Sequence, residues 1–160
     1  MVLKADRAGQ ADLDQLLEIA AARRQEYAEY QPQFWRPATD AVARQRRFFA
    51  SLIDKDDTLI VVVRDGVNVH GFAVARAADA PPVYHPGGLT CVIDDFAVAD
   101  PTEWPTAGPL LLDAVRAWGF ERGATQLIVV VAHLDQPKRA FLRTAQLDIA
   151  SEWWVAAIPG

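Results

Sequence analysis

The sequence predicts a single α+β domain of three layers, in which a mixed sheet of about six or seven strands carries helices on both faces. The main observation is the order of the segments, which reads β-α-α-β-β-β-α-β-α-β across residues 1–160. Thr58–Val63 and Gln126–Ala132 are apolar at nearly every position, which is typical of strands buried from both sides. Hydrophobic residues make up 51% of the chain and no polar linker divides it, so one core is expected.

The boundaries of each element follow from periodicity and turn residues. Helices are predicted where apolar residues recur every three or four positions, and strands where β-branched and apolar residues run together. Asp65-Gly66 favours a tight turn and therefore predicts a hairpin. In chain order the expected elements are strand Val2–Ala5, helix Ala11–Tyr27, helix Asp40–Ile53, strand Thr58–Val63, strand Asn68–Ala77, strand Leu89–Ala99, helix Pro109–Arg122, strand Gln126–Ala132, helix Gln136–Ala145 and strand Glu152–Ile158.

The composition argues against several classes of protein. Cys91 is the single cysteine, so neither an internal disulfide nor a cysteine-rich metal site is expected. His70, His85 and His133 lack the spacing of metal ligands, and no metal is expected. A formal net charge of −5 argues against nucleic acid as a partner. The N-terminal residues lack an apolar signal core and no apolar run reaches membrane-spanning length, so we expect a cytoplasmic protein with no membrane partner.

A loop that leads directly into a helix is the strongest functional signal in the chain. Asp100–Gly108 follows a predicted strand and precedes the helix expected to begin at Pro109. Unpaired backbone N–H groups and the positive end of the helix dipole gather at such a junction, which suits a phosphate group. The chain contains neither G-x-x-x-x-G-K-[ST] nor G-x-G-x-x-G, so nucleoside triphosphates and dinucleotides are disfavoured.

The same stretch resembles motif A of the GNAT superfamily, the acyl-CoA-dependent N-acyltransferases. Phe96-Ala97-Val98 matches the strand end L-x-V, and Gly108 matches the second glycine of the loop Q/R-x-x-G-x-G/A. Glu103 and Thr106 depart from the loop pattern at its first position and first glycine. The resemblance implies acetyl-CoA as co-substrate and no metal. The residues that it assigns to acetyl-CoA binding are Phe96, Val98, Trp104, Thr106, Ala107, Gly108 and Asp135.

A second match lies near the C-terminus. Asp135–Leu142 is similar to the family's N-x-x-[AS]-x-x-F-Y, and Asp94-Asp95 before F-x-V is most similar to the spermidine/spermine acetyltransferase branch. Asp135 replaces the asparagine, and Leu142 replaces the tyrosine that such enzymes use as a general acid. A leucine cannot protonate a leaving thiolate. The proton must then come from water or another group, or transfer is slow or absent.

The resemblance also directs attention to two groups of residues. Asp94 and Asp95 are the candidate catalytic bases, and their alternative role is a solvated strand face or an ion pair with an arginine. The region after the first helix lines the acceptor pocket in the family, and aromatic rings with carboxylates suit an amine. An ordinary amphipathic helix would explain the same residues. The candidate substrate-binding residues are Glu26, Tyr27, Tyr30 and Trp35.

These observations predict transfer of an acetyl group from acetyl-CoA to a primary amine, by direct attack in a ternary complex. The acceptor, a small molecule or a peptide amine, stays open. The departures at Glu103, Thr106 and Leu142 favour an alternative, a catalytically weak or silent domain that binds acyl-CoA or a protein partner. A small-molecule binding protein that uses the aromatic loop without CoA is a third option. Dimers are common in the family, so a homodimer is one expected assembly.

Overall fold

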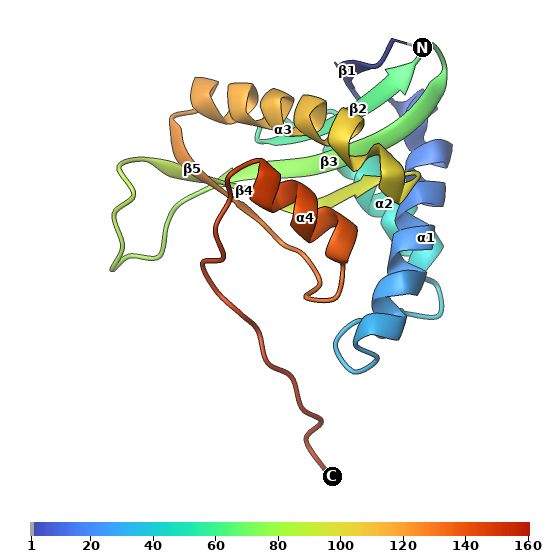
Figure 1. Ribbon diagram of the computed structural model, residues 1–160, viewed down its shortest axis with the longest axis vertical. Helices are drawn as coiled ribbons and strands as arrows, with labels where there is room; N and C mark the ends of the chain where they lie inside the picture. The colour runs from blue at the N-terminus through green and yellow to red at the C-terminus, as the bar shows by residue number, and fades with distance from the viewer. Residues whose placement is uncertain (1) are drawn as a thin grey trace.

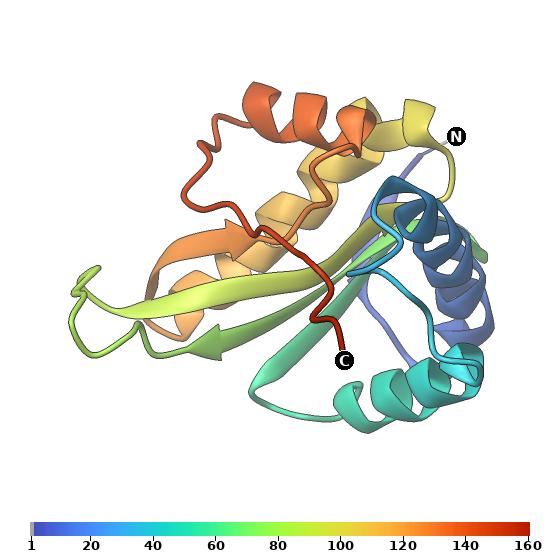
Figure 2. The ribbon, with the colours of Figure 1, turned by 90° about the horizontal axis from the view of Figure 1, so that it is seen from below.

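The computed structural model describes residues 2–160, which form one five-stranded sheet with two α-helices packed on each face (Figures 1 and 2). The strands lie in sequence order from β1 to β5, and neighbours are antiparallel except for the parallel pair β4–β5. The elements are β1 Lys4–Arg7, α1 Leu13–Tyr30, α2 Ala41–Leu52, β2 Thr58–Asp65, β3 Asn68–Ala78, β4 Leu89–Val98, α3 Trp104–Glu121, β5 Ala124–Val129 and α4 Gln136–Thr144, with short 3₁₀ turns at Gln10–Asp12 and Pro101–Glu103.

Two apolar cores separate the layers, as the buried runs in the sequence predict. Leu16 of α1 and Phe49 of α2 pack with Phe72 against one face of the sheet. Leu111 of α3 and Phe141 of α4 pack against the other face. Figure 2 shows α3 and α4 on one side of the sheet and α1 and α2 on the other. The prediction of a mixed sheet covered on both faces is therefore confirmed.

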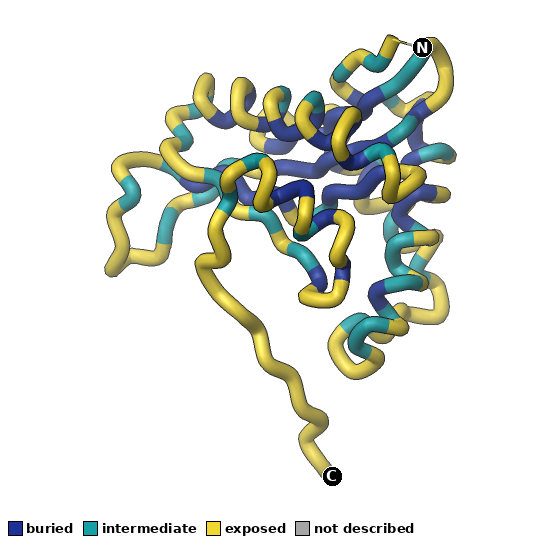
Figure 3. Tube along the Cα trace, in the orientation of Figure 1, coloured by how far each residue is buried: buried dark blue, intermediate teal, exposed yellow. Residues whose placement is uncertain are grey.

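The predicted count of six or seven strands is wrong for residues 2–160, where five strands form. Glu152–Ile158 is not a strand, and the element order ends at α4. Residues 147–160 are irregular and extend beyond α4 (Figures 1 and 3), with Leu147 packed on the core and the Trp153 ring 6.0 Å from that of Phe34. A strand needs a hydrogen-bonded neighbour, and this segment has none within the described residues. Trp153 and Trp154 are consequently 83% and 89% exposed.

Helix α3 begins at Trp104, five residues before the position that the sequence suggests. The side chain of Asp100 accepts a hydrogen bond from Thr102 N at 2.8 Å and initiates the preceding 3₁₀ turn. Pro105 lies in the first turn of α3, where a missing N–H costs no intrahelical hydrogen bond. Pro109 lies inside the helix and does remove one. No helix formed by residues 2–160 is both long enough and apolar enough to span a membrane.

Candidate active site

Strand β4 pairs with β5 only over its N-terminal half, and the two chain segments then separate. The last register pair is Ile93 with Val129, and the Val130 N–H donates to the Ile93 carbonyl at 3.1 Å. The next residue of β4, Asp94, is the extra residue of a β-bulge, because Val74 and Ala75 of β3 pair with Asp95 and Ile93. Beyond this point the β4 backbone has no β5 partner. We call the gap between residues 94–98 and residues 130–132 the fork.

The two predicted catalytic aspartates have different surroundings at the mouth of the fork. Asp94 is exposed, and its carboxylate lies 3.2 Å from Nε of Arg76. Asp95 is only partly exposed, and burial raises the pKa of its carboxyl group. The positive charges of Lys138 and Arg24 oppose that rise, whereas Asp94 adds to it. A carboxylate with a raised pKa is the better proton acceptor at neutral pH.

Lys138 of α4, which is not among the predicted site residues, extends into the fork. Its side chain is 2% exposed, and Nζ donates to the Val130 carbonyl at 3.1 Å. Nζ also lies 5.5 Å from the centre of the Phe96 ring. Burial lowers the pKa of Lys138 to about 8, although Asp135 and Asp95 act in the opposite direction. Its spacing from Leu142, one helical turn later, would have indicated a position on the buried face of α4.

Asp135 begins α4 and joins it to α1. It caps the helix by accepting from Lys138 N at 3.3 Å, and its Oδ2 accepts from the hydroxyl of Tyr27 at 2.7 Å. Both residues are buried. Burial, followed by the charge of Asp135, raises the pKa of Tyr27. Asp135, predicted to bind acetyl-CoA, is thus hydrogen-bonded to Tyr27, predicted to bind the acceptor.

The four predicted substrate-binding residues lie together at the C-terminal end of α1 and in the loop after it. The Tyr27 ring is 5.7 Å from that of Tyr30 and 5.1 Å from that of Trp35, between centroids. Glu26 pairs instead with Arg23 at 2.6 Å. Because the hydroxyl of Tyr27 is occupied by Asp135, only the rings around it could face a ligand.

The residues predicted to bind the pyrophosphate surround the first turn of α3. Trp104 is buried, stacks on Phe141 with 5.2 Å between centroids, and meets Phe96 edge to face at 4.9 Å. Its expected place in a loop is therefore wrong. Thr106 is exposed, whereas Ala107 and Val98 are buried. A Cβ added to Gly108 would lie 2.7 Å from the Phe141 ring, so this glycine allows α4 to approach α3 closely.

Glu103 points toward a basic side chain. Its Oε1 lies 2.6 Å from Nδ1 of His70 on β3, and Nε2 of His70 lies 3.1 Å from a carboxylate oxygen of Asp65. The hydrogen bond with Glu103 raises the pKa of His70; burial opposes the rise, and Asp65 contributes to it. The charge that would repel a phosphate is thus partly neutralised.

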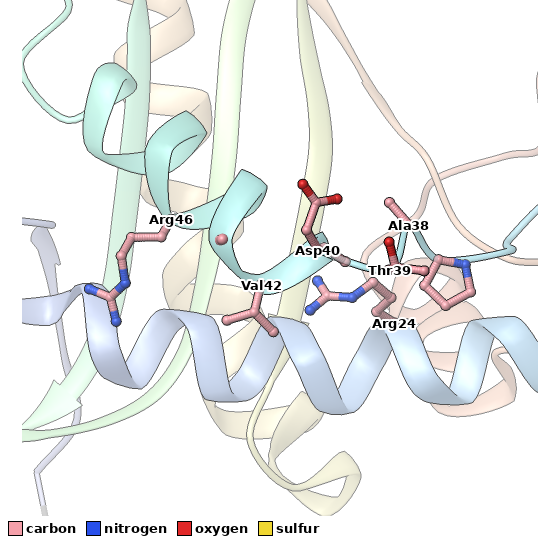
Figure 4. Close-up of a pocket in the computed structure, with 9 residues that line it drawn as sticks. Arg24, Ala38, Thr39, Asp40, Val42 and Arg46 are labelled. Carbon is pink, nitrogen blue, oxygen red and sulfur yellow. The ribbon is translucent and has the colours of Figure 1, made fainter.

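A surface pocket of about 610 Å³ lies between α1 and the start of α2 (Figure 4). Arg24 lines this pocket, and its positive charge also acts on Asp95. The Arg24 guanidinium donates to Gln45 at 2.5 Å. The remaining lining residues are Pro37, Ala38, Thr39, Asp40, Ala41, Val42, Ala43 and Arg46.

Comparisons with known proteins agree with this architecture. No protein-family model matches the sequence, and no curated protein is significantly similar to it. Among solved structures, a mutant of the BH1408 protein from Bacillus halodurans superposes with a TM-score of 0.82 at 14% identity, covering 99% of this chain and 100% of that one. A predicted acetyltransferase from Clostridium acetobutylicum, solved with acetyl-CoA, has a TM-score of 0.73 at 16% identity over 98% and 96% of the two chains.

The aminoglycoside N-acetyltransferase AAC(6')-Iy, in complex with a bisubstrate analogue, has a TM-score of 0.71 at 10% identity. The superposition covers 100% of each chain. This chain shares its fold with these acetyltransferases. Identities this low establish the architecture alone. The fork, Asp95, Lys138 and the first turn of α3 are the features of this chain on which a functional proposal can be based.

Proposed function

We propose that this protein transfers an acetyl group from acetyl-CoA to an amine. The observation that carries the proposal is the separation of β4 from β5 at the Asp94 bulge, in a fold shared with a structure solved with acetyl-CoA. Beyond Ile93, the β4 edge has backbone groups without a β5 partner. Such an edge suits the amide groups of a pantetheine arm, which can pair with it as a strand would.

The residues at the start of α3 suit the phosphates of the same ligand. The first turn of a helix has backbone N–H groups without intrahelical partners and carries the positive end of the helix dipole. Thr106 is exposed in that turn, and the pairing of Glu103 with His70 reduces the negative charge nearby. The pyrophosphate would therefore lie beside Thr106, the exposed residue of this turn.

Asp95 is the base that we favour over Asp94. Its raised pKa allows it to take a proton from a substrate ammonium at neutral pH, whereas Asp94 is exposed and paired with Arg76. The deprotonated amine then attacks the thioester carbon directly, with no covalent enzyme intermediate. A backbone N–H near Val98 stabilises the oxyanion that forms. The aromatic residues Tyr30 and Trp35 suit a cationic acceptor approaching from the α1 side.

One feature favours the second candidate, a silent acyl-CoA or partner-binding domain. Side chains already fill the fork, because Lys138 reaches Val130 and the Trp104–Phe141 stack covers the start of α3. A domain that no longer catalysed transfer could keep side chains in this position without loss of function.

Calorimetry with acetyl-CoA, followed by assays of thiol release, separates these functions. The acceptor panel contains a polyamine, an aminoglycoside, an amino acid and a peptide with a free N-terminus. We expect acetyl-CoA to bind and at least one amine to accelerate thiol release over the buffer rate. Binding without release for any amine would favour the silent domain. An absence of binding would contradict both functions and leave only the fold.

A further inference from the structure

The amino group of Lys138 is unusual because it is a cation enclosed at the point where the two strands separate. Lys4 and Lys55, the other lysines of the chain, are exposed, whereas Lys138 is buried. Desolvating an ammonium is costly unless nearby groups compensate. A buried lysine is therefore expected either to have all its N–H groups hydrogen-bonded or to serve a function that uses its charge.

The hydrogen bonding of Lys138 is incomplete. An ammonium has three N–H donors, and within residues 2–160 Nζ donates one hydrogen bond, to the Val130 carbonyl. It forms no ion pair within 4 Å of a carboxylate in the same residues, although Asp95 on β4 and Asp135 at the start of α4 attract it electrostatically. Two N–H groups are therefore left inside the fork for another acceptor. Arg23 of α1 acts on the ammonium by repulsion, and the hydroxyl of Tyr27, also on α1, is held by Asp135.

The position of Lys138 on α4 relates it to the missing acid. Lys138 and Leu142 are four residues apart, so their side chains lie on one face of the helix, one turn from each other. Both are buried. Leu142 offers no proton, whereas Lys138, one turn away on the same face, can donate one.

We propose that Lys138 is the proton donor to the thiolate that leaves when an acetyl thioester reacts in the fork. This inference rests on the proposed acetyl transfer. The substrate ammonium first loses one proton to solvent through Asp95. The neutral amine forms a C–N bond with the carbonyl carbon, and the C–S bond breaks with its electron pair going to sulfur. Nζ of Lys138 gives that sulfur a proton, and the thiol departs.

The remaining proton restores the enzyme. The nitrogen of the new amide gives its extra proton to Asp95, and the proton passes on to the neutral amine of Lys138. Asp95 and Lys138 influence each other's protonation, consistent with an exchange between them. A pKa near 8 suits a group that must give up and regain a proton at neutral pH. Each cycle releases one proton to solvent, as acetylation of an ammonium requires.

The test compares Lys138→Gln and Lys138→Met with the wild type, using the acceptor from the panel that the wild type acetylates fastest. Gln can still donate to the Val130 carbonyl but has no proton to transfer, and Lys55→Met is the matched control on the surface. We expect both Lys138 variants to lower kcat with acetyl-CoA by about 10²-fold or more, the usual size of a general-acid effect. Lys55→Met is expected to match the wild type.

A change of leaving group distinguishes proton donation from a structural role. The thiolate of para-nitrophenyl thioacetate is a weak base that departs without protonation. The loss caused by Lys138→Gln is therefore expected to shrink to about threefold or less with this thioester. The kcat of the wild type is also expected to fall as pH rises through about 8, where the ammonium loses its proton. That decline should be absent in Lys138→Gln.

Each other outcome counts against the proposal. Wild-type kcat in Lys138→Gln, or an equal loss with both thioesters, would overturn it while leaving acetyl transfer intact. Unfolding of both variants in circular dichroism would assign Lys138 a purely structural role. If the wild type binds acetyl-CoA but releases no thiol, no leaving group exists for Lys138 to protonate. If it does not bind acetyl-CoA at all, calorimetry shows that the proposed function itself has failed.

Discussion

The carboxylate of Glu103 lies 2.6 Å from Nδ1 of His70 and connects the start of α3 to the start of β3. Glu103 occupies the loop position at which the resemblance leads one to expect Gln or Arg. Its negative charge is directed toward the imidazole, and its second oxygen accepts from Asp100 N at 3.3 Å. The residue therefore stabilises the turn that precedes α3, and the strength of this contact depends on the protonation of His70.

Stability should consequently depend on pH through His70. The pKa of His70 is raised in the folded protein, so its contribution is complete below the unfolded pKa of about 6.5 and is lost as pH rises through the folded value. We expect the difference in unfolding free energy between the wild type and His70→Asn to be largest at about pH 5.5–6.5. The difference should shrink as pH rises above this range. Urea denaturation at several pH values measures this difference. His85→Asn, at an exposed histidine, should show no such trend.

Substitution of Asp95 and of Asp94 should have different effects on turnover. Asp95→Asn is expected to lower turnover by about 10²-fold with acetyl-CoA affinity unchanged, because the amide cannot accept the substrate proton. Asp94→Asn is the matched control, since Asp94 is exposed and paired with Arg76. We expect it to change turnover by less than about threefold. Steady-state kinetics and calorimetry on both variants check this. The reverse pattern would move the base to Asp94.

Gly108 should prove important for packing, which makes it a poor probe of phosphate binding. The added methyl of Gly108→Ala would lie 2.7–2.8 Å from two ring atoms of Phe141, whose ring is stacked on Trp104. We expect a loss of about 1–3 kcal/mol in unfolding free energy. Adding Phe141→Leu should recover part of that loss, in a double-mutant cycle measured by urea denaturation. Gly9→Ala has open space around its Cβ and serves as the control. Strictly additive losses would show that the ring moves aside freely.

Much of this architecture could be predicted from periodicity, because each core-forming segment has its own apolar pattern. The order of elements through α4 follows from those patterns. The start of α3 could not be predicted in the same way, because Pro105 and Pro109 are typical of loops. Pro105 is compatible with the first turn of a helix, and the burial of Trp104 and Leu111 offsets the hydrogen bond lost at Pro109. The segment Glu152–Ile158 has a strand-like sequence, but a strand forms only against a partner.

The candidate site was harder to predict because it depends on register and on contacts between distant elements. The acidic pair Asp94-Asp95 was visible in the sequence, whereas the bulge that exposes one aspartate and partly buries the other arises from pairing with β3. Lys138 stands at the [AS] position of the C-terminal motif, but this departure does not indicate where its amine lies. Its importance appears only when α4 packs over the fork and its amine meets the Val130 carbonyl.

The end of α4 offers a stabilising substitution. Gln146 has a φ of 64°, a left-handed conformation that costs a residue with a Cβ roughly 1 kcal/mol. The Leu147 N–H donates to the Leu142 carbonyl at 3.0 Å, which closes the helix in the manner that usually selects glycine. Gln146→Gly is therefore expected to raise the unfolding free energy by about 0.5–1 kcal/mol. Gln146→Ala retains the Cβ and should bring no gain. Thermal and urea denaturation of both variants provide the comparison.

The hydrogen bond between Tyr27 and Asp135 should contribute substantially to stability. Tyr27→Phe keeps the ring against Trp35 but removes the hydroxyl that donates to Asp135 at 2.7 Å. The buried carboxylate then lacks one of its partners, and we expect a loss of about 1–3 kcal/mol in unfolding free energy. Tyr84→Phe is the matched control because Tyr84 is 70% exposed. Urea denaturation at pH 7 measures both variants. A tyrosine hydroxyl is protonated at this pH, and burial raises the pKa of Tyr27 further. Equal stability of the two variants would mean that Asp135 finds another donor, and α1 and α4 would then be coupled by packing alone.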